Sequence, residues 1–134
     1  MKVSAIQYQP VFGNEQASVA ALGPLLKEAA GSDLVVLPEL AATGYNFENR
    51  KEAMGFAADP EKSEFVGVLK SFCKTTGAAV VAGFNELAGN EIFNSALLID
   101  KSGIRGKYRK IQLFMREKDF FTAGNLHPEV FDVG

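Results

Sequence analysis

The sequence is poor in the side chains that cross-link small domains. It holds one cysteine, Cys73, and one histidine, His127, in 134 residues. A single cysteine cannot form an internal disulfide, and these two residues do not make a cluster of soft ligands for zinc. We therefore expect a cytoplasmic protein without a metal site.

The sequence also lacks an excess of charge of one sign. Its formal net charge is -2, its pI is about 5.4, and both signs are scattered along the chain. Such a balance provides no long-range field that would attract nucleic acid. Basic residues do crowd between Arg105 and Lys110, but the acidic balance and the scarcity of nearby aromatic residues favour a solvated face over a nucleic-acid site.

Long apolar runs are absent as well. No stretch approaches the roughly 20 apolar residues needed to span a bilayer. The first residues alternate in polarity and then meet Pro10, so they lack the apolar core of a signal peptide. With 47% hydrophobic and 22% charged residues the composition is that of an ordinary globular chain, and one domain, or a large piece of one, is the default. We expect a soluble protein with no membrane partner.

The apolar pattern of the first 39 residues predicts a strand, a helix and a second strand. Residues 2–9 alternate like a strand, and Asn14 can cap a helix that continues to about residue 30. Pro24 removes a backbone bond inside this helix and predicts a kink or two joined pieces. Residues 33–39 show no polar alternation, which is typical of a central strand covered on both faces.

The remaining pattern continues the alternation of helices and strands. Asp59 and Pro60 provide a cap and a first helical position for a helix that ends at Gly77. Other elements are predicted at residues 49–57 (helix) and at residues 78–84, 92–100, 104–110 and 130–133 (strands). This order indicates an α/β sheet with helices on one or both faces, and its last strand leaves an open edge.

Glu39 stands at the end of the strand predicted for residues 33–39, at the edge where open α/β sheets place their ligands. A carboxylate beside an apolar interior is costly to ionise unless a cation stands near, so its proton affinity should rise and make it a usable general base. A surface glutamate that closes a loop or pairs with a lysine explains the same residue equally well.

Lys110 lies in a strand-like run between Tyr108 and Phe114. If it reaches the same edge as Glu39, its ammonium could hold the negative oxygen that forms on a carbonyl or imidate carbon during attack. A solvated basic cluster is the alternative. We expect Glu39 and Lys110 to converge on one substrate pocket, with Tyr45 and Phe114 as its walls.

Three further residues carry reactive groups. Glu117 could orient Lys110 or contact a substrate amine, although a surface charge on a helix is favoured for it in isolation. Cys73 falls beside Phe72 on the apolar side of a predicted helix, where a small buried thiol is inert. His127 lies in a late loop without a partner acid or thiol, which favours a structural or exposed histidine.

Four blocks of sequence, taken in their order, resemble a known family. They are Leu37-Pro38-Glu39-Leu40 with Thr43-Gly44-Tyr45, Phe93-Asn94-Ser95-Ala96, Gly106-Lys107-Tyr108-Arg109-Lys110-Ile111-Gln112-Leu113-Phe114, and Glu117-Lys118-Asp119-Phe120-Phe121-Thr122-Ala123-Gly124-Asn125. Together they are similar to the carbon-nitrogen hydrolases of the nitrilase superfamily, and they cover essentially the whole chain.

The resemblance implies that residues 1–134 are the N-terminal portion of a single carbon-nitrogen hydrolase domain, half of an α-β-β-α sandwich with a mixed sheet covered by helices. It implies Glu39 as general base, Lys110 as oxyanion stabiliser and Glu117 as an additional acid, acting on a small non-peptide amide or nitrile without metal or organic cofactor. The cysteine nucleophile of such enzymes would follow beyond Gly134, so the chain alone is expected to be inactive. The family habit of pairing sandwiches implies a homo-oligomer.

One position departs from the family pattern. Gln112 stands where histidine is frequent, which could change the hydrogen bonding near Lys110 without removing its charge.

The leading interpretation is an amidase-type hydrolase. The alternative is a non-catalytic binding or assembly module that retains the fold and self-associates through the open sheet edge.

Overall fold

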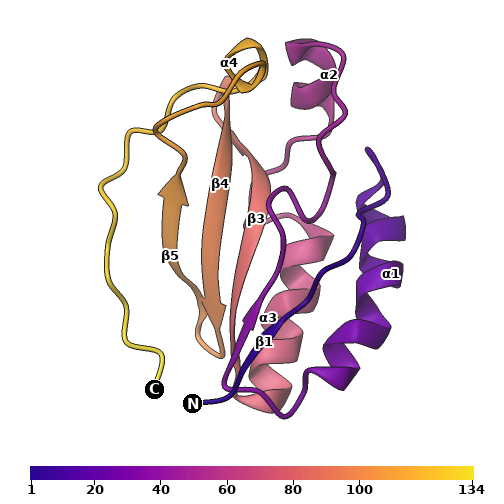
Figure 1. Ribbon diagram of the computed structural model, residues 1–134, viewed down its shortest axis with the longest axis vertical. Coiled ribbons are helices and arrows are strands. Elements are labelled where there is room, and N and C mark those ends of the chain that lie inside the picture. The colour runs from indigo at the N-terminus through magenta and orange to yellow at the C-terminus, as the bar shows by residue number, and fades with distance from the viewer.

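The computed structural model describes all of residues 1–134 and contains one five-stranded sheet with helices packed beside it (Figure 1). The strands are β1 (Val3–Ala5), β2 (Leu34–Val36), β3 (Ala79–Ala88), β4 (Glu91–Asp100) and β5 (Gly103–Arg109), and the helices are α1 (Glu15–Glu28), α2 (Arg50–Gly55), α3 (Glu64–Thr76) and α4 (Glu117–Phe120). The strand order is β1-β2-β3-β4-β5, parallel as far as β3 and antiparallel from β3 to β5. The predicted α/β class is confirmed. None of the helices has the length and apolar character needed to cross a bilayer.

Helix α1 begins where its cap was predicted. The side chain of Asn14 accepts a hydrogen bond from the backbone N–H of Ala17 at 2.9 Å. The helix then runs through Pro24 as one piece, so of the two predicted alternatives, a kink or two joined pieces, the second does not occur. Leu22 and Leu26, on either side of the proline, are buried, and their packing holds the helix together despite the missing backbone bond.

Helix α3 begins later than the sequence pattern indicated. Its N-cap is Ser63, whose Oγ accepts from the N–H of Val66 at 3.2 Å, whereas Asp59 lies in the preceding turn. Both residue types cap helices well, and a long-range contact decides between them. The carboxylate of Glu15 in α1 accepts hydrogen bonds from the Ser63 hydroxyl and from the first turn of α3. Gly77 ends the helix as predicted, in the left-handed region with φ of 80°.

Helices α1 and α3 cover one face of the sheet (Figure 1). Successive side chains of a strand point to opposite faces. Every second side chain of each strand therefore lies on the face away from α1 and α3, here called the open face. Leu34, Val36 and Val81 are only half-buried there. The prediction that residues 33–39 are covered on both faces is therefore wrong for this structure, because both long helices pack on the same side. The covered core contains Val35, Val80, Ala82, Phe84, Leu97 and Ile99 against Leu22, Leu26, Phe65 and Leu69.

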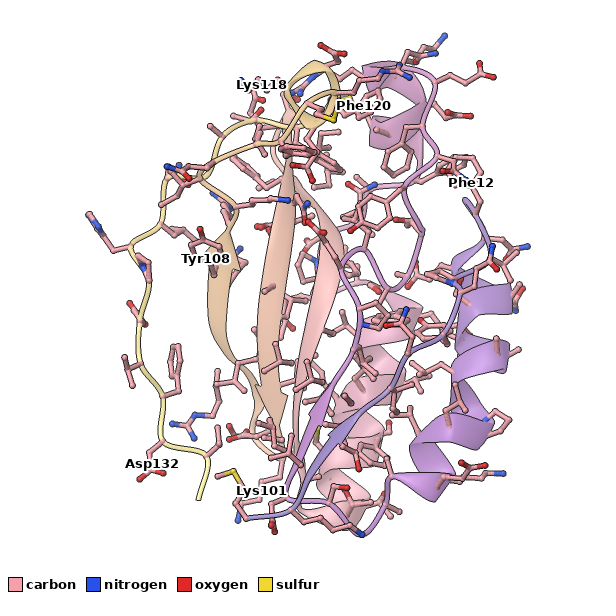
Figure 2. The ribbon with its side chains drawn as sticks, in the orientation of Figure 1. Phe12, Lys101, Tyr108, Lys118, Phe120 and Asp132 are labelled. Atoms are coloured by element: carbon pink, nitrogen blue, oxygen red, sulfur yellow. The ribbon has the colours of Figure 1, made fainter.

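A smaller aromatic cluster closes the end of the sheet that carries α2 and α4 (Figure 2). Phe47 is 4% exposed, and its ring centroid lies between 5.7 and 6.4 Å from those of Phe12, Phe56, Phe120 and Phe121. This cluster joins the loop that follows β2 to the segment around α4. It therefore brings residues close to position 40 beside residues close to position 120.

The last residues do not form the predicted strand. Residues 130–133 are irregular, make no backbone ladder bonds, and run alongside β5 (Figure 1). The ring of Phe131 instead lies against the backbone of Gly106, where a Cβ would collide with it. Phe131 thus packs its side chain against the sheet, and the segment does not pair with β5 as a strand.

Glu86 of β3 is a buried charge on the side of the sheet that faces the helices, with its side chain 1% exposed. Its carboxylate accepts from Arg109 Nη2 at 2.6 Å and from Arg109 Nε at 3.0 Å. Lys107 Nζ and Ser95 Oγ also donate to it. Burial works to raise the pKa of Glu86, but the hydrogen bonds from Arg109, Lys107 and Ser95 outweigh it and hold the pKa below its ordinary value. The cluster therefore ties β3, β4 and β5 together.

The substitution Glu86→Gln should lower the free energy of unfolding by about 3 kcal/mol, the low end of the range for breaking a buried ion pair. The low end applies because the Lys107 side chain is 32% exposed and can be solvated when its partner is lost. Urea denaturation at neutral pH measures the change. As a control, Glu61→Gln removes an exposed pair with Lys70 and should change stability little.

Glu86 should also make the free energy of unfolding depend on pH. Because the folded-state pKa of Glu86 lies below the unfolded value, its contribution to stability is present above the unfolded pKa and is lost as the pH falls through the folded pKa. Acidification should therefore destabilise the wild-type protein more steeply than Glu86→Gln. If the free energy of unfolding changed with pH to the same extent in both proteins, Glu86 would not be the buried carboxylate that stabilises the sheet.

Candidate active site

Glu39 is held by an extended segment that continues β2 along β3. The N–H of Leu37 donates to the carbonyl of Val81 at 2.8 Å, and the N–H of Gly83 donates to the carbonyl of Pro38 at 3.1 Å. Leu40 then adopts a positive φ of 47° and turns the chain into the following loop. Glu39 is thereby fixed at the open face, at the carboxyl end of the parallel strands, where the sequence predicted it.

Gly83 makes this close approach possible. A Cβ at this position would lie 2.4 Å from the Cα of Glu39 and 2.6 Å from both the backbone nitrogen of Leu40 and the carbonyl oxygen of Pro38. All three atoms are backbone and cannot move aside cheaply. The glycine is therefore a requirement of the site geometry.

Lys110 follows directly on β5. Its N–H donates to the carbonyl of Asn94 at 2.8 Å, and its own carbonyl accepts from the N–H of Gly124 at 2.9 Å. Arg109 faces the helices with Glu86, so the next residue along the strand faces the opposite side. The strand alternation thus turns Lys110 to the open face.

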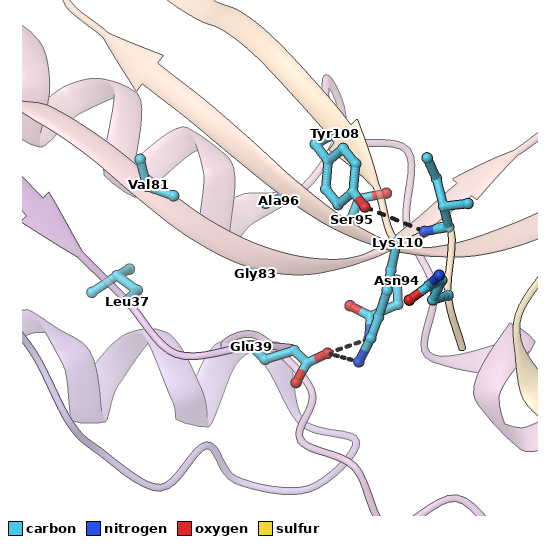
Figure 3. Close-up of a pocket in the computed structure, with 11 residues that line it drawn as sticks. Leu37, Glu39, Val81, Gly83, Asn94, Ser95, Ala96, Tyr108 and Lys110 are labelled. Atoms are coloured by element: carbon cyan, nitrogen blue, oxygen red, sulfur yellow. Dashed lines mark hydrogen bonds and ion pairs between the residues drawn. The ribbon is translucent and has the colours of Figure 1, made fainter. Parts of the chain in front are cut away.

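The side chains of Glu39, Lys110 and Glu117 meet at one point. Lys110 Nζ lies 2.9 Å from Glu39 Oε1 and 2.8 Å from Glu117 Oε1, and Figure 3 shows the contact with Glu39. Glu117 is in turn oriented by the N–H of Phe114, which donates to its Oε2 at 2.7 Å. The structure therefore brings together the three residues singled out by the sequence, and their catalytic roles remain predictions.

Asn94 is the residue that sequence reasoning missed. Its Nδ2 donates to Glu39 Oε1 at 2.5 Å and to Glu117 Oε1 at 3.2 Å, and the residue is only 4% exposed. A signal was present, because Asn94 lies in one of the four family-like blocks, on a strand whose even-numbered residues share one face. Its pairing with the end of β5 could not be read from that block alone.

A cavity of about 660 Å³ opens beside this cluster (Figure 3). Both Glu39 and Lys110 line it, together with Leu37, Val81, Gly83, Asn94, Ser95, Ala96, Tyr108, Ile111 and Gln112. Tyr45 and Phe114, predicted as walls of this pocket, do not line it. They border an adjoining hollow of about 450 Å³ that also includes Glu117. Tyr45 nevertheless touches the cluster, because its hydroxyl donates to Glu39 Oε2.

The electrostatics of the cluster differ from the expectation for Glu39. Burial works to raise the pKa of Glu39, but hydrogen bonds from Tyr45, Lys110 and Asn94 outweigh it, and the pKa lies below its ordinary value. The expected rise in proton affinity is therefore wrong, because the cation and two further donors do stand near. Burial acts to lower the pKa of Lys110, but Glu117 and Glu39 outweigh it and raise the pKa. At neutral pH Glu39 is thus a carboxylate and Lys110 an ammonium.

The two other reactive residues lie outside the site. Cys73 is fully buried among the helix-side core residues, its Sγ donates to the carbonyl of Ile99 at 3.5 Å, and burial raises the pKa of its thiol to about 11. This agrees with the inert thiol inferred from the sequence. His127 is exposed in the irregular C-terminal segment, as expected.

The fold and the site define an α/β protein with a carboxylate–ammonium–carboxylate cluster at the edge of a mixed sheet. The family model of the carbon-nitrogen hydrolases matches residues 2–134. A nitrilase of Pyrococcus abyssi is 42% identical over 100% of this chain and 52% of its own length, and a 2-oxoglutaramate amidase of Bacillus subtilis is 31% identical over 92% of this chain and 48% of its own length. The chain belongs to the carbon-nitrogen hydrolase family.

Solved structures share the fold. A CN-hydrolase superfamily protein from Xanthomonas campestris matches with a TM-score of 0.81 and 26% identity, over 94% of this chain and 47% of that one. An N-terminal amidase matches with a TM-score of 0.82 and 24% identity, over 90% of this chain and 30% of that one. The chain spans about half the length of the curated relatives it matches.

The close approach at Gly83 gives a direct test of how the site is positioned. Gly83→Ala should lower the free energy of unfolding by about 1 to 3 kcal/mol, the usual cost of overpacking. It should also displace Glu39 from Lys110, which a crystal structure of the variant would show. The matched control is Gly67→Ala, in α3, where a Cβ meets nothing within 4 Å and alanine favours the helix. Equal stability of the two variants would show that the contact at Gly83 does not constrain the site.

Proposed function

We propose that the protein is a carbon-nitrogen hydrolase that acts on a small non-peptide amide or nitrile, with Glu39 as general base, Lys110 as oxyanion stabiliser and Glu117 as an additional active-site acid. The observation that carries the proposal is the position of Lys110 Nζ, 2.9 Å from Glu39 and 2.8 Å from Glu117, at the wall of the open cavity. An ionised acid and a charged ammonium at one cavity wall are the two groups that thiol-dependent amide hydrolysis requires.

The proposed reaction starts with the transfer of a thiol proton to Glu39. The thiolate then attacks the amide carbon, a carbon–sulfur bond forms, and the carbonyl oxygen becomes an oxyanion that accepts a hydrogen bond from Lys110. The carbon–nitrogen bond breaks as the nitrogen takes the proton held by Glu39, and ammonia leaves. Water, deprotonated by Glu39, then hydrolyses the thioester to a carboxylic acid and returns the thiol. No metal or organic cofactor takes part in these steps.

We propose that the thiol comes from a residue outside positions 1–134. Cys73 cannot serve, because it lies on the helix-covered side of the sheet with a raised pKa, whereas Glu39 and Lys110 lie on the open face. The curated relatives, about twice as long, leave room for such a residue. In this proposal residues 1–134 are the N-terminal portion of one hydrolase domain and are inactive alone. Reading the gene beyond the codon for Gly134 tests it, and an in-frame cysteine codon should follow shortly.

An amide substrate is preferred to a nitrile. The similar proteins include amidases as well as a nitrilase, as their names state. The cytoplasmic location and the homo-oligomer inferred from the sequence stay predictions.

A non-catalytic assembly module is the second candidate, favoured by the half-buried apolar side chains of the open face. Leu34, Val81 and Ala96 border a hollow of about 310 Å³ on that face. This candidate predicts that the 134-residue chain folds and self-associates without hydrolysing any amide. Size-exclusion chromatography and circular dichroism would distinguish it, since a disordered or aggregated chain would exclude it.

The catalytic assignment predicts large effects at two residues. In the intact gene product, Glu39→Gln and Lys110→Ala should each lower kcat/KM for ammonia release from an amide panel by about 10² or more, the usual loss for a general base or an oxyanion donor. The control is Lys118→Ala, at the outer surface of α4, where the side chain is exposed (Figure 2). It should leave the rate unchanged. Full activity in either site variant would rule out the assignment.

A further inference from the structure

The backbone and the side chain of Asn94 both act on Lys110. Its carbonyl accepts from the Lys110 N–H at 2.8 Å, which fixes the lysine main chain at the end of β5. Its side-chain amide donates to Glu39 Oε1 and to Glu117 Oε1, the two atoms that also accept from Lys110 Nζ. Two donors therefore share the same two acceptors and close a ring of four groups.

The charges of this ring show what the neutral amide of Asn94 contributes. Glu39 and Glu117 carry two negative charges, and Lys110 provides one positive charge. Two carboxylates close together disfavour each other's ionised form, and a hydrogen bond from a neutral amide stabilises the charged form without adding a charge. An asparagine amide has two N–H groups, so it can give one to each carboxylate. Because Asn94 is 4% exposed, water does not readily replace it.

The ring also determines how the ammonium is used. A lysine ammonium has three N–H groups, and two are taken by Glu39 and Glu117. The third is left for the cavity that Lys110 lines. Its direction depends on the positions of the two carboxylates, and these are set in part by Asn94.

We propose that Asn94 is a positioning residue that holds Glu39 and Glu117 on either side of Lys110 Nζ, so that the third N–H of the ammonium is directed into the cavity. The hydrolytic use of that N–H rests on the proposed function. The arrangement of the four side chains does not depend on that function. Loss of the amide leaves two carboxylates to share one ammonium, and the pKa of Glu39 then rises because its burial is less compensated. The charged groups that face Glu39 are Lys110, after β5, and Glu117, in α4; Tyr45, in the loop after β2, donates to it.

The chain offers a matched control for this residue. Asn85 stands directly opposite Asn94 in the pairing of β3 with β4, and it is 1% exposed. Its amide donates to the carbonyl of Ala53 at 2.9 Å and contacts neither carboxylate. Asn85→Ala therefore removes a buried asparagine from the same pair of strands without touching the ring.

The first experiment follows the side-chain carboxyl of Glu39 by carbon NMR during an acid titration of the 134-residue chain. In Asn94→Ala the midpoint should move to higher pH relative to wild type, and in Asn85→Ala it should not move. Equal midpoints in wild type and Asn94→Ala would overturn the proposal, as would equal shifts in both variants.

A second experiment keeps Asn94 in place and so does not depend on how well Asn94→Ala folds. The two side-chain amide protons of Asn94 should give separate resonances, one sensitive to Glu39→Gln and the other to Glu117→Gln. If both protons respond to one substitution alone, the bridge does not exist. In the intact gene product, Asn94→Ala should lower kcat more than it raises KM, and Asn85→Ala should change neither.

The two proposals can fail separately. Absence of any amide hydrolysis by the intact protein, with the NMR results as expected, would remove the proposed function and leave the positioning role of Asn94. Full activity of Asn94→Ala, with the titration midpoint of Glu39 unchanged from wild type, would remove the positioning role alone.

Discussion

The ammonium of Lys110, held between the carboxylates of Glu39 and Glu117, is the interaction on which the functional account depends. It joins three segments that are separate in the sequence: the extension of β2, the end of β5 and the short helix α4. Each segment is fixed by its own contacts. Gly83 leaves space for the extension of β2, and the backbone hydrogen bonds to Asn94 and Gly124 hold the end of β5. The aromatic cluster around Phe47 helps to hold α4. The geometry of the site is thus a consequence of packing over the whole chain.

The alternation of side chains along β5 couples the site to the stability of the sheet. Arg109 points to the helix side and pairs with the buried Glu86, and the next residue, Lys110, points to the open face and pairs with Glu39. A one-residue slip of β5 would exchange these two faces and would leave both acids without their partners. The buried ion pair therefore contributes to the register that the site needs, as well as to stability.

Local signals predicted much of the fold. Asn14 and Gly77 set helix ends through hydrogen bonds within a few residues, and the strands predicted at residues 92–100 and 104–110 correspond to β4 and β5. The errors all involve distant contacts. Ser63 replaced Asp59 as a cap because Glu15, from another helix, reaches it. Residues 33–39 were expected to be covered on both faces, which depends on where α1 and α3 pack, and residues 130–133 pack against β5 without pairing with it.

In the site, too, local sequence signals were informative and distant contacts were not predicted. Glu39, Lys110 and Glu117 could be singled out from their sequence blocks, and the structure brings them together. The lowered pKa of Glu39 could not be predicted, because it depends on hydrogen bonds from Tyr45 and Asn94 that no spacing in the sequence reveals. The role of Asn94 was hidden for the same reason, since it arises from the pairing of β4 with the end of β5.

The most direct test of the central interaction is the pKa of Glu39 measured by NMR in the wild-type chain and in Lys110→Met, which keeps the length of the side chain and removes its charge. The pKa of Glu39 should lie below that of an ordinary glutamate in the wild type and should rise in the variant, because the effect of burial is then opposed by fewer partners. An identical pKa in the two proteins would contradict the account, because the ammonium of Lys110 would then not be the partner of Glu39.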